Sequence, residues 1–190
     1  MTLDIGTGDG RFVYQSARSN PTQFFIGIDP NTRPLQKISQ KIYRTRAKVG
    51  APNALFIQAS VENLPEELNG IANEVQVHFP WGSLLRAVAL GELKALEGIR
   101  RVCTSNAVLK LTIGLDVQRD SSEIQRLGLQ PLSPDFLSGQ LHERYLAARF
   151  EIIEYTGTPP VDWPGLGTSW AKRLQVGHTR KITYLVARAI

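Results

Sequence analysis

The chain begins with a short apolar run that leads directly into a glycine-rich turn. Residues 2–6 (TLDIG) have the apolar character of a buried strand, and a helical pattern follows over residues 9–19. Between them lie Gly6, Gly8 and Gly10. Glycines adopt positive φ angles and let a ligand approach the backbone closely, and the N-terminus of the following helix favours negative charge. This strand–turn–helix unit predicts a cofactor site at the start of an α/β fold.

Strand-like and helical runs alternate along the rest of the chain. Further apolar strand-like runs lie at residues 23–29, 54–59, 74–79, 106–115, 150–156 and 181–189. Helical patterns lie over residues 32–47, after Trp81 with an interruption near Gly91, and over residues 135–148. This order predicts one α/β domain over residues 1–190, a Rossmann-like, mostly parallel seven-stranded sheet with helices on both faces.

The spacing of the glycines separates two classes of cofactor. A dinucleotide fingerprint needs G-x-G-x-x-G, but Arg11 stands at the third glycine position. The observed G-x-G-x-G, with Asp4 two residues ahead, resembles the signature of class I S-adenosylmethionine (SAM)-dependent methyltransferases. Asp29 closes the second strand, where a carboxylate can accept both ribose hydroxyls of either cofactor. Glu62 follows the third strand, where this methyltransferase class contacts adenine, so SAM is favoured over NAD.

The net charge of +5 is concentrated in two segments. Residues 31–50 contain six basic side chains, residues 163–190 contain five, and neither segment contains an acid. The rest of the chain is net acidic. Two basic segments on an acidic body favour an anionic partner, nucleic acid above all, over the alternative of two solvated faces.

Two tryptophans are placed to meet such a partner. Trp81 follows the fourth strand in FPWG, where a methyl group would be presented, and Trp170 lies in the basic C-terminal segment. An enzyme that modifies a base must take it out of its stack, and stacking on an aromatic ring contributes about 1–3 kcal/mol. We therefore expect Trp81 and Trp170 to hold an unstacked base. Packing in the core or rim is the alternative, and Trp163 is assigned to it.

Several classes of protein are disfavoured. Cys103 is the only cysteine, which excludes an internal disulfide and is compatible with a reducing cytosol. No apolar run approaches the roughly 20 residues of a membrane span, and no export signal is recognisable. His78, His142 and His178 lack the spacing of metal ligands. We expect a cytoplasmic monomer without a metal ion or a membrane partner.

Four motifs together resemble one enzyme family. LDIGTGDGR, IGIDP, FPWGSLL and SWAKRL occur in this order between residues 3 and 174. They are similar to those of the aminoglycoside-resistance methyltransferases of the kanamycin–apramycin type. The glycine turn is common to many methyltransferases, whereas FPWG and SWAKRL in combination are much more specific. The resemblance implies SAM-dependent methylation of N1 of adenine 1408 in 16S rRNA of the small (30S) ribosomal subunit, and thereby aminoglycoside resistance.

The resemblance also implies roles for individual residues. Trp81 and Trp170 would sandwich the flipped adenine. Cofactor-binding residues would be Asp4, Gly6, Gly8, Asp29, Val61, Glu62, His78, Phe79, Pro80 and Ser83, with Thr168 closing the pocket. Phosphates would be held by Lys37, Lys41, Arg44, Arg173 and Arg180. Because adenine N1 already carries a lone pair, no catalytic base is required and catalysis would be mainly orientation.

The sequence departs from the family pattern at several points. Family members have an N-terminal extension, which this chain is expected to lack because only Met1 and Thr2 precede Leu3 of the first strand. His178 and Leu127 stand where family members tend to carry basic residues, although Arg126 adjoins Leu127. These departures predict weaker ribosome affinity than is usual in the family.

Other functions remain open at the level of sequence. One is another RNA methyltransferase, such as the tRNA (guanine-N7) type, in which further residues normally separate the Phe-Pro strand end from the tryptophan. Another is a non-catalytic RNA-binding module on a methyltransferase fold, against which Asp4, Gly6, Gly8 and Asp29 argue. A small-molecule methyltransferase is less compatible with the two basic segments.

Overall fold

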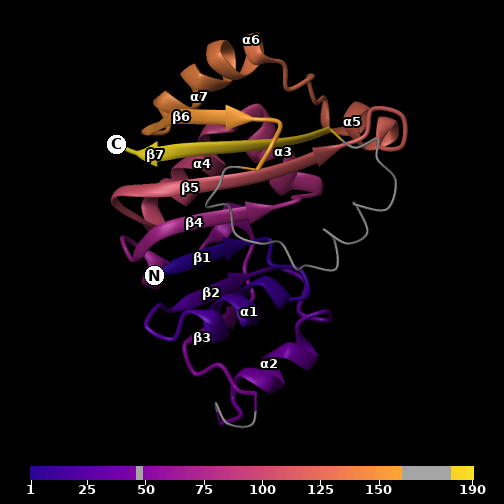
Figure 1. Cartoon of the computed structure of the whole chain (residues 1–190). Coiled ribbons are helices and arrows are strands. Elements are labelled where there is room, and N and C mark those ends of the chain that lie inside the picture. Colours follow the sequence, from indigo (N-terminus) through magenta and orange to yellow (C-terminus); the bar gives the residue numbers. More distant parts are fainter. Residues whose placement is uncertain (46–48, 160–180) are drawn as a thin grey trace.

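A seven-stranded sheet forms the centre of the protein (Figure 1). The computed structural model describes residues 1–45, 49–159 and 181–190. The strands are β1 (Thr2–Ile5), β2 (Phe25–Ile28), β3 (Ala54–Ile57), β4 (Ala72–His78), β5 (Cys103–Leu115), β6 (Phe150–Thr156) and β7 (Lys181–Ala189). Their order across the sheet is β3-β2-β1-β4-β5-β7-β6. Strand β7 is antiparallel to β5 and β6, and the other neighbours are parallel, which confirms the predicted mostly parallel α/β sheet.

Helices and short helical turns connect these strands. The helices are α1 (Arg11–Ser19), α2 (Gln36–Ile42), α3 (Gly82–Leu90), α4 (Leu93–Val102), α5 (Ser121–Leu127), α6 (Pro134–Phe136) and α7 (His142–Ala147). The turns are η2 (Val61–Asn63), η3 (Glu66–Leu68) and the π-helical η4 (Leu137–Leu141). The predicted interruption near Gly91 is confirmed, because this residue separates α3 from α4 with a φ of 67°. None of the helices in the described ranges has both the length and the apolar character needed to cross a membrane.

Two helices differ from the sequence-based expectation. Helix α2 covers only Gln36–Ile42 instead of residues 32–47. Pro34 lacks an N–H and restricts the residue before it, which delays the start of the helix. At the other end, the N–H of Ala51 donates to the carbonyl of Ile42 over 3.1 Å as the chain turns back towards β3. Helix α5 was not predicted, because Ile124 and Leu127 are its only apolar residues and two positions do not display a helical period.

The core is divided between the two faces of the sheet. Along β2, Phe25 packs in a cluster with Phe12 and Val13 of α1, whereas Ile26 and Ile28 belong to a larger cluster with residues of α3 and α4. Successive strand residues point to opposite faces, so helices cover both faces as predicted. The winding of the chain reverses at β1, which lies between β2 and β4. In open α/β sheets, ligands bind at the carboxyl ends of the strands at such a reversal.

Candidate active site

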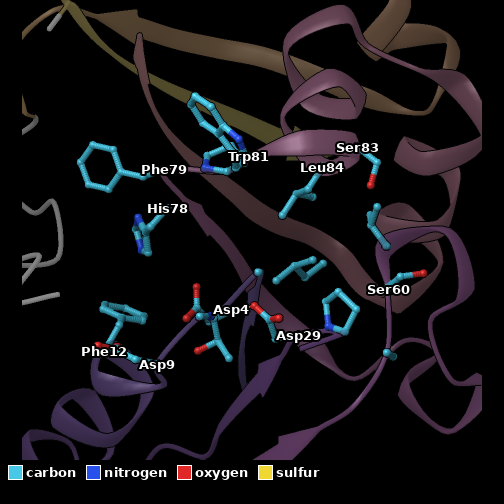
Figure 2. A pocket seen from close by; sticks show the side chains of 18 of the residues that line it. Asp4, Asp9, Phe12, Asp29, Ser60, His78, Phe79, Trp81, Ser83 and Leu84 are labelled. Atoms are coloured by element: carbon cyan, nitrogen blue, oxygen red, sulfur yellow. Dashed lines mark hydrogen bonds between the residues drawn. The ribbon is translucent and has the colours of Figure 1, made fainter. Parts of the chain in front are cut away.

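A pocket of about 260 Å³ opens at this point, beyond the carboxyl ends of β1, β2 and β4 (Figure 2). Its lining includes every predicted cofactor residue within the described chain, namely Asp4, Gly6, Gly8, Asp29, Val61, Glu62, His78, Phe79, Pro80 and Ser83. Trp81 also lines it. Thr168 and Trp170 lie outside the described residues. The structure therefore brings together side chains from four separate loops that the sequence placed at strand ends.

The turn after β1 requires glycine for two different reasons. Gly10 is the N-cap of α1 with a φ of 70°, and a Cβ atom there would lie 2.7 Å from the ring of Phe56. Gly8 has a φ of 59°, yet a Cβ atom there would meet no other atom within 4 Å. At Gly10 the glycine allows close packing, whereas at Gly8 it supplies a left-handed turn beside open space. A ligand can reach the backbone at Gly8.

Asp29 is anchored to this turn. Its Oδ2 accepts a hydrogen bond from the N–H of Gly8 at 2.9 Å, and its Oδ1 accepts one from the N–H of Asn31 at 2.8 Å. The two bonds fix the half-buried carboxylate across the gap between β1 and β2. An ionised carboxylate has about four acceptor positions, so Asp29 retains the capacity to accept hydrogen bonds from a ligand.

Asp4 is the most buried acid of the pocket. Only 3% of the residue is exposed, and its Oδ1 has no hydrogen-bond partner among the described residues. Burial raises the pKa of Asp4 to about 7; the hydroxyl of Thr7 opposes part of the increase, and the negative charges of Asp29 and Asp9 add to it. A buried acceptor left without a partner costs about 1–3 kcal/mol. Figure 2 shows Asp4 and Asp29 facing the same space, where a cationic donor would satisfy both.

Glu62 lies in η2, which follows β3. Burial would raise the pKa of Glu62, but hydrogen bonds from its own backbone N–H and from the hydroxyls of Ser60 and Ser83 lower it below the ordinary value. The carboxylate therefore stays ionised and links the loop after β3 to the start of α3. The pocket thus has one acid on β1, one directly after β2 and one after β3.

His78 lines the pocket as a neutral ring. Its Nε2 lies 2.6 Å from Oε1 of Gln76 and its Nδ1 lies 3.1 Å from the hydroxyl of Thr112. Burial, with the positive charge of Lys110, lowers the pKa of His78 to about 3. The rings of His78 and Phe12 make a T-shaped contact, with 4.7 Å between their centroids. Because both nitrogens have partners, His78 offers a ligand its ring surface.

Trp81 stands at the mouth of the pocket. Strand β4 ends at His78, one residue earlier than predicted, because Phe79 has a left-handed φ of 49°. The N–H of Phe79 donates to the carbonyl of Thr112 at 2.7 Å. Trp81 itself has an extended backbone, and 48% of the residue is exposed. An indole that is half exposed beside a pocket leaves a broad apolar ring surface available for stacking.

The predicted phosphate-binding residues fall into two groups. Lys37, Lys41 and Arg44 are exposed at α2, whose opposite face buries Ile38 and Ile42. The ammonium of Lys41 lies 6.0 Å from the ring centroid of Tyr14. Arg173 and Arg180 lie outside the described residues. Helix α2 therefore presents a basic surface that the pocket lining does not include.

The structure adds pocket residues that the sequence did not single out. Thr7 and Asp9 come from the glycine turn, Phe12 from α1 and Leu84 from α3. Phe12 and Leu84 look like ordinary core residues in the sequence, and only their position in the fold reveals that they line a pocket. Within residues 1–45, 49–159 and 181–190, no cluster of three or more side chains is suited to hold a metal ion.

Comparison with known proteins identifies the family. Residues 1–189 match the family model of the NpmA 16S rRNA (adenine(1408)-N(1))-methyltransferases. The enzyme of that name from Streptoalloteichus tenebrarius is 35% identical over 181 residues, which are 95% of this chain and 82% of the relative. The crystal structure of the aminoglycoside resistance methyltransferase NpmB1 is similar with a TM-score of 0.87 and 41% identity, and the match covers 100% of this chain and 86% of that one.

A second solved structure carries a cosubstrate. It is a mutant of the 16S rRNA (adenine(1408)-N(1))-methyltransferase from Catenulisporales acidiphilia, crystallised with SAM. Its TM-score is 0.88 and its identity 34%, over 100% of this chain and 85% of that one. The protein therefore belongs to the 16S rRNA (adenine(1408)-N(1))-methyltransferase family.

Proposed function

We propose that this methyltransferase transfers the methyl group of SAM to N1 of adenine 1408 in 16S rRNA and thereby confers aminoglycoside resistance. The observation that supports this most strongly is the coincidence of an acidic pocket with the exposed indole of Trp81 in a member of this family. We further propose that residues 1–190 act as a single-domain monomer on the small ribosomal subunit in the cytoplasm.

The pocket fits SAM. The carboxylates of Asp4, Asp29 and Glu62 suit a ligand that carries positive charge and several hydroxyl donors. The Oδ1 of Asp4 has no hydrogen-bond partner among the described residues, and the ammonium of the methionine part would donate to it. Asp29 would accept the ribose hydroxyls, and Glu62 would contact the adenine edge. When bound, SAM supplies an electrophilic methyl group.

The base would be held by aromatic rings. Trp81 would form one side of a sandwich and Trp170 the other. The lone pair of adenine N1 forms the new bond to carbon, so no protein base has to remove a proton. His78, whose nitrogens are both engaged, is consistent with this mechanism. The π faces of the indoles would also favour the positive charge that appears on the methylated base.

The RNA would be held by charge outside the pocket. Lys37, Lys41 and Arg44 would contact phosphates from α2, and Arg173 and Arg180 would do so from the C-terminal basic segment. Such contacts position the RNA without reading its sequence. The identity of the target would then depend on the shape of the decoding site and on which base reaches Trp81.

The test is methylation of unmodified 30S subunits, with modified positions mapped by reverse transcription. A SAM-dependent stop at adenine 1408 is the expected result, and reactions without SAM are the control. A stop at another position would contradict the proposed target but not the reaction class. No stop on ribosomal RNA, together with methylation of tRNA, would support the alternative RNA methyltransferase. Failure to bind SAM in a titration would indicate a non-catalytic module.

A further inference from the structure

The structure assigns Gln76 as a positioning residue for cofactor binding: oriented by Glu74, it fixes the proton of His78 on Nε2, so that this ring forms an uncharged wall of the pocket. The inference rests on the proposed function, because it assumes that the pocket binds the positively charged cofactor SAM. His78 and Phe12 belong to the pocket lining, whereas Gln76 and Glu74 lie outside it. Gln76 therefore acts on the cofactor only through the ring of His78.

The residues involved lie on one face of two neighbouring strands. Glu74, Gln76 and His78 alternate along β4, so their side chains point to the same side of the sheet. In the parallel register with β5, Gln76 lies beside Lys110 and His78 lies beside Thr112. Gln76 is 3% exposed, and Thr112 is fully buried. These polar side chains form a row that ends at the pocket.

The hydrogen bonds along this row have one consistent direction. The ammonium of Lys110 lies 3.0 Å from Oε2 of Glu74, and the side-chain amide of Gln76 donates to Oε1 of Glu74. Because a carboxylate only accepts hydrogen bonds, it turns the NH₂ group of Gln76 towards itself and the amide oxygen towards the pocket. That oxygen, Oε1, lies 2.6 Å from Nε2 of His78. An amide oxygen also only accepts, so Nε2 carries the proton.

The other ring nitrogen completes the assignment. Burial lowers the pKa of His78 to about 3, with a contribution from the positive charge of Lys110, so the ring is neutral and carries one proton at neutral pH. With that proton on Nε2, the lone pair of Nδ1 faces the hydroxyl of Thr112, which lies 3.1 Å away and can donate to it. Each bond of the row then joins a donor to an acceptor.

This arrangement matters because of the charge of the ligand. SAM carries a sulfonium and an ammonium group, and an imidazolium in the pocket wall would repel both. A neutral ring held at both nitrogens and packed against Phe12 instead presents a fixed, uncharged surface (Figure 2). Asp4 lies beside Gln76 in the register of β1 with β4. Its carboxylate therefore also gains from a wall that carries no competing cation.

Two matched variants test the direction of the hydrogen bonds in the SAM-free protein. The readout is the long-range ¹⁵N–¹H spectrum of the His78 ring, which distinguishes a protonated from an unprotonated nitrogen, and His78→Asn identifies the signals. At about pH 7, the wild type should have Nε2 protonated and Nδ1 unprotonated. Glu74→Gln removes the carboxylate that orients Gln76, so both tautomers should appear. Lys110→Gln breaks the same ion pair but keeps that carboxylate, so the single tautomer should remain.

Cofactor affinity gives a second measurement. Gln76→Leu removes the acceptor for Nε2 and releases the ring, so SAM affinity measured by calorimetry should fall about three- to tenfold, as for the loss of one neutral hydrogen bond. Glu74→Gln should lose less, and Lys110→Gln should stay within about twofold of the wild type. If Gln76→Leu does not fold, Glu74→Gln, at a partly exposed position, carries the same comparison with Lys110→Gln.

Three results would overturn the inference. The first is a wild-type His78 protonated on Nδ1 or on both nitrogens. The second is the same tautomer population in Glu74→Gln and Lys110→Gln, because the ion pair would then only support the strands. The third is unchanged SAM affinity in Gln76→Leu. If instead the wild type does not bind SAM, the proposed function fails, and the spectrum of the SAM-free protein still reports where His78 carries its proton.

Discussion

The side of the pocket formed by β1, β2 and η2 and the side formed by the turn after β4 are held in different ways. On the first side, Asp4 is almost fully buried and Asp29 is bonded to the glycine turn next to it. On the second side, Trp81 is half exposed, and the nearby Phe79 donates a backbone hydrogen bond to Thr112 of β5, a strand later in the chain. We propose that the first side, called the acidic side, binds the cofactor, and that the second side, called the aromatic side, binds the target base.

This difference predicts that mutations should separate cofactor affinity from catalysis. Changes on the acidic side should weaken SAM binding, and changes on the aromatic side should slow methyl transfer while SAM still binds. The following experiments test that division, beginning with the largest effect.

Replacement of Trp81 by alanine should reduce methylation of adenine 1408 by about 100-fold or more, because the base loses both a stacking partner and its orientation. SAM affinity, measured by calorimetry, should change by less than about twofold. Trp81→Phe is the matched control, because it keeps an aromatic ring and should retain intermediate activity. Full activity in Trp81→Ala would exclude the sandwich, and a parallel loss of SAM affinity would abolish the proposed division of the pocket.

Replacement of Asp29 by alanine should weaken SAM binding by about 10- to 100-fold, because each hydrogen bond to a charged group contributes about 1.5–3 kcal/mol. Asp29→Asn keeps the size and one acceptor oxygen, so its loss should be smaller. At saturating SAM, the methylation rate should recover to a large extent in both variants. Unchanged affinity in the calorimeter would contradict the assignment of Asp29 to the cofactor.

The titration of Asp4 makes the stability of the folded protein depend on pH. Its pKa is about 7 in the folded protein, against an ordinary value of 3.8. Between these values the folded protein retains a proton that the unfolded chain has lost, so this group makes stability fall as pH rises through the window. Without SAM, Asp4→Asn should therefore be more stable than the wild type at pH 8, by about 1–4 kcal/mol, and should approach it at pH 4.

Urea denaturation across this pH range checks the effect. Saturating SAM should reduce the difference at pH 8, because a bound ammonium would favour the ionised form of Asp4. If the stability difference between the two proteins is the same at pH 4 and pH 8, Asp4 does not titrate in this window. The claim that the SAM-free pocket raises the pKa of Asp4 is then wrong.

The smallest effect concerns the basic surface of α2. Lys41→Glu should lower affinity for the 30S subunit, and the plot of log affinity against log salt concentration should become shallower by about one. Lys94→Glu, an equally exposed change on α4, is the matched control. Neither variant should alter SAM affinity. Equal salt slopes in the wild type and Lys41→Glu would indicate that Lys41 does not contact RNA phosphates and that this side of α2 is only an exposed polar surface.

The sequence predicted most of the acidic side because its signals are local. The sequence shows Gly6, Gly8 and Gly10 within a few residues of Asp4 on the first strand, and the structure gives all three glycines positive φ angles. Parallel strands then bring their carboxyl ends to one edge, so Asp4, Asp29 and Glu62 could be assigned to one pocket without knowing any distance. The early end of β4 and the short α2 were missed, because left-handed Phe79 and the return to Ala51 depend on contacts elsewhere in the chain.

By itself, the sequence determined the α/β class, the order of the strands, the glycine turn and the tryptophan after β4, since each depends on hydrophobic periodicity or on the conformational range of single residues. Only the tertiary structure decided that Oδ1 of Asp4 has no hydrogen-bond partner among the described residues, that His78 is neutral with both nitrogens engaged, and that Phe79 turns left-handed against Thr112 of β5. The physical reason is that burial, hydrogen bonding and pKa depend on residues distant in the chain, which become neighbours only after the sheet has assembled.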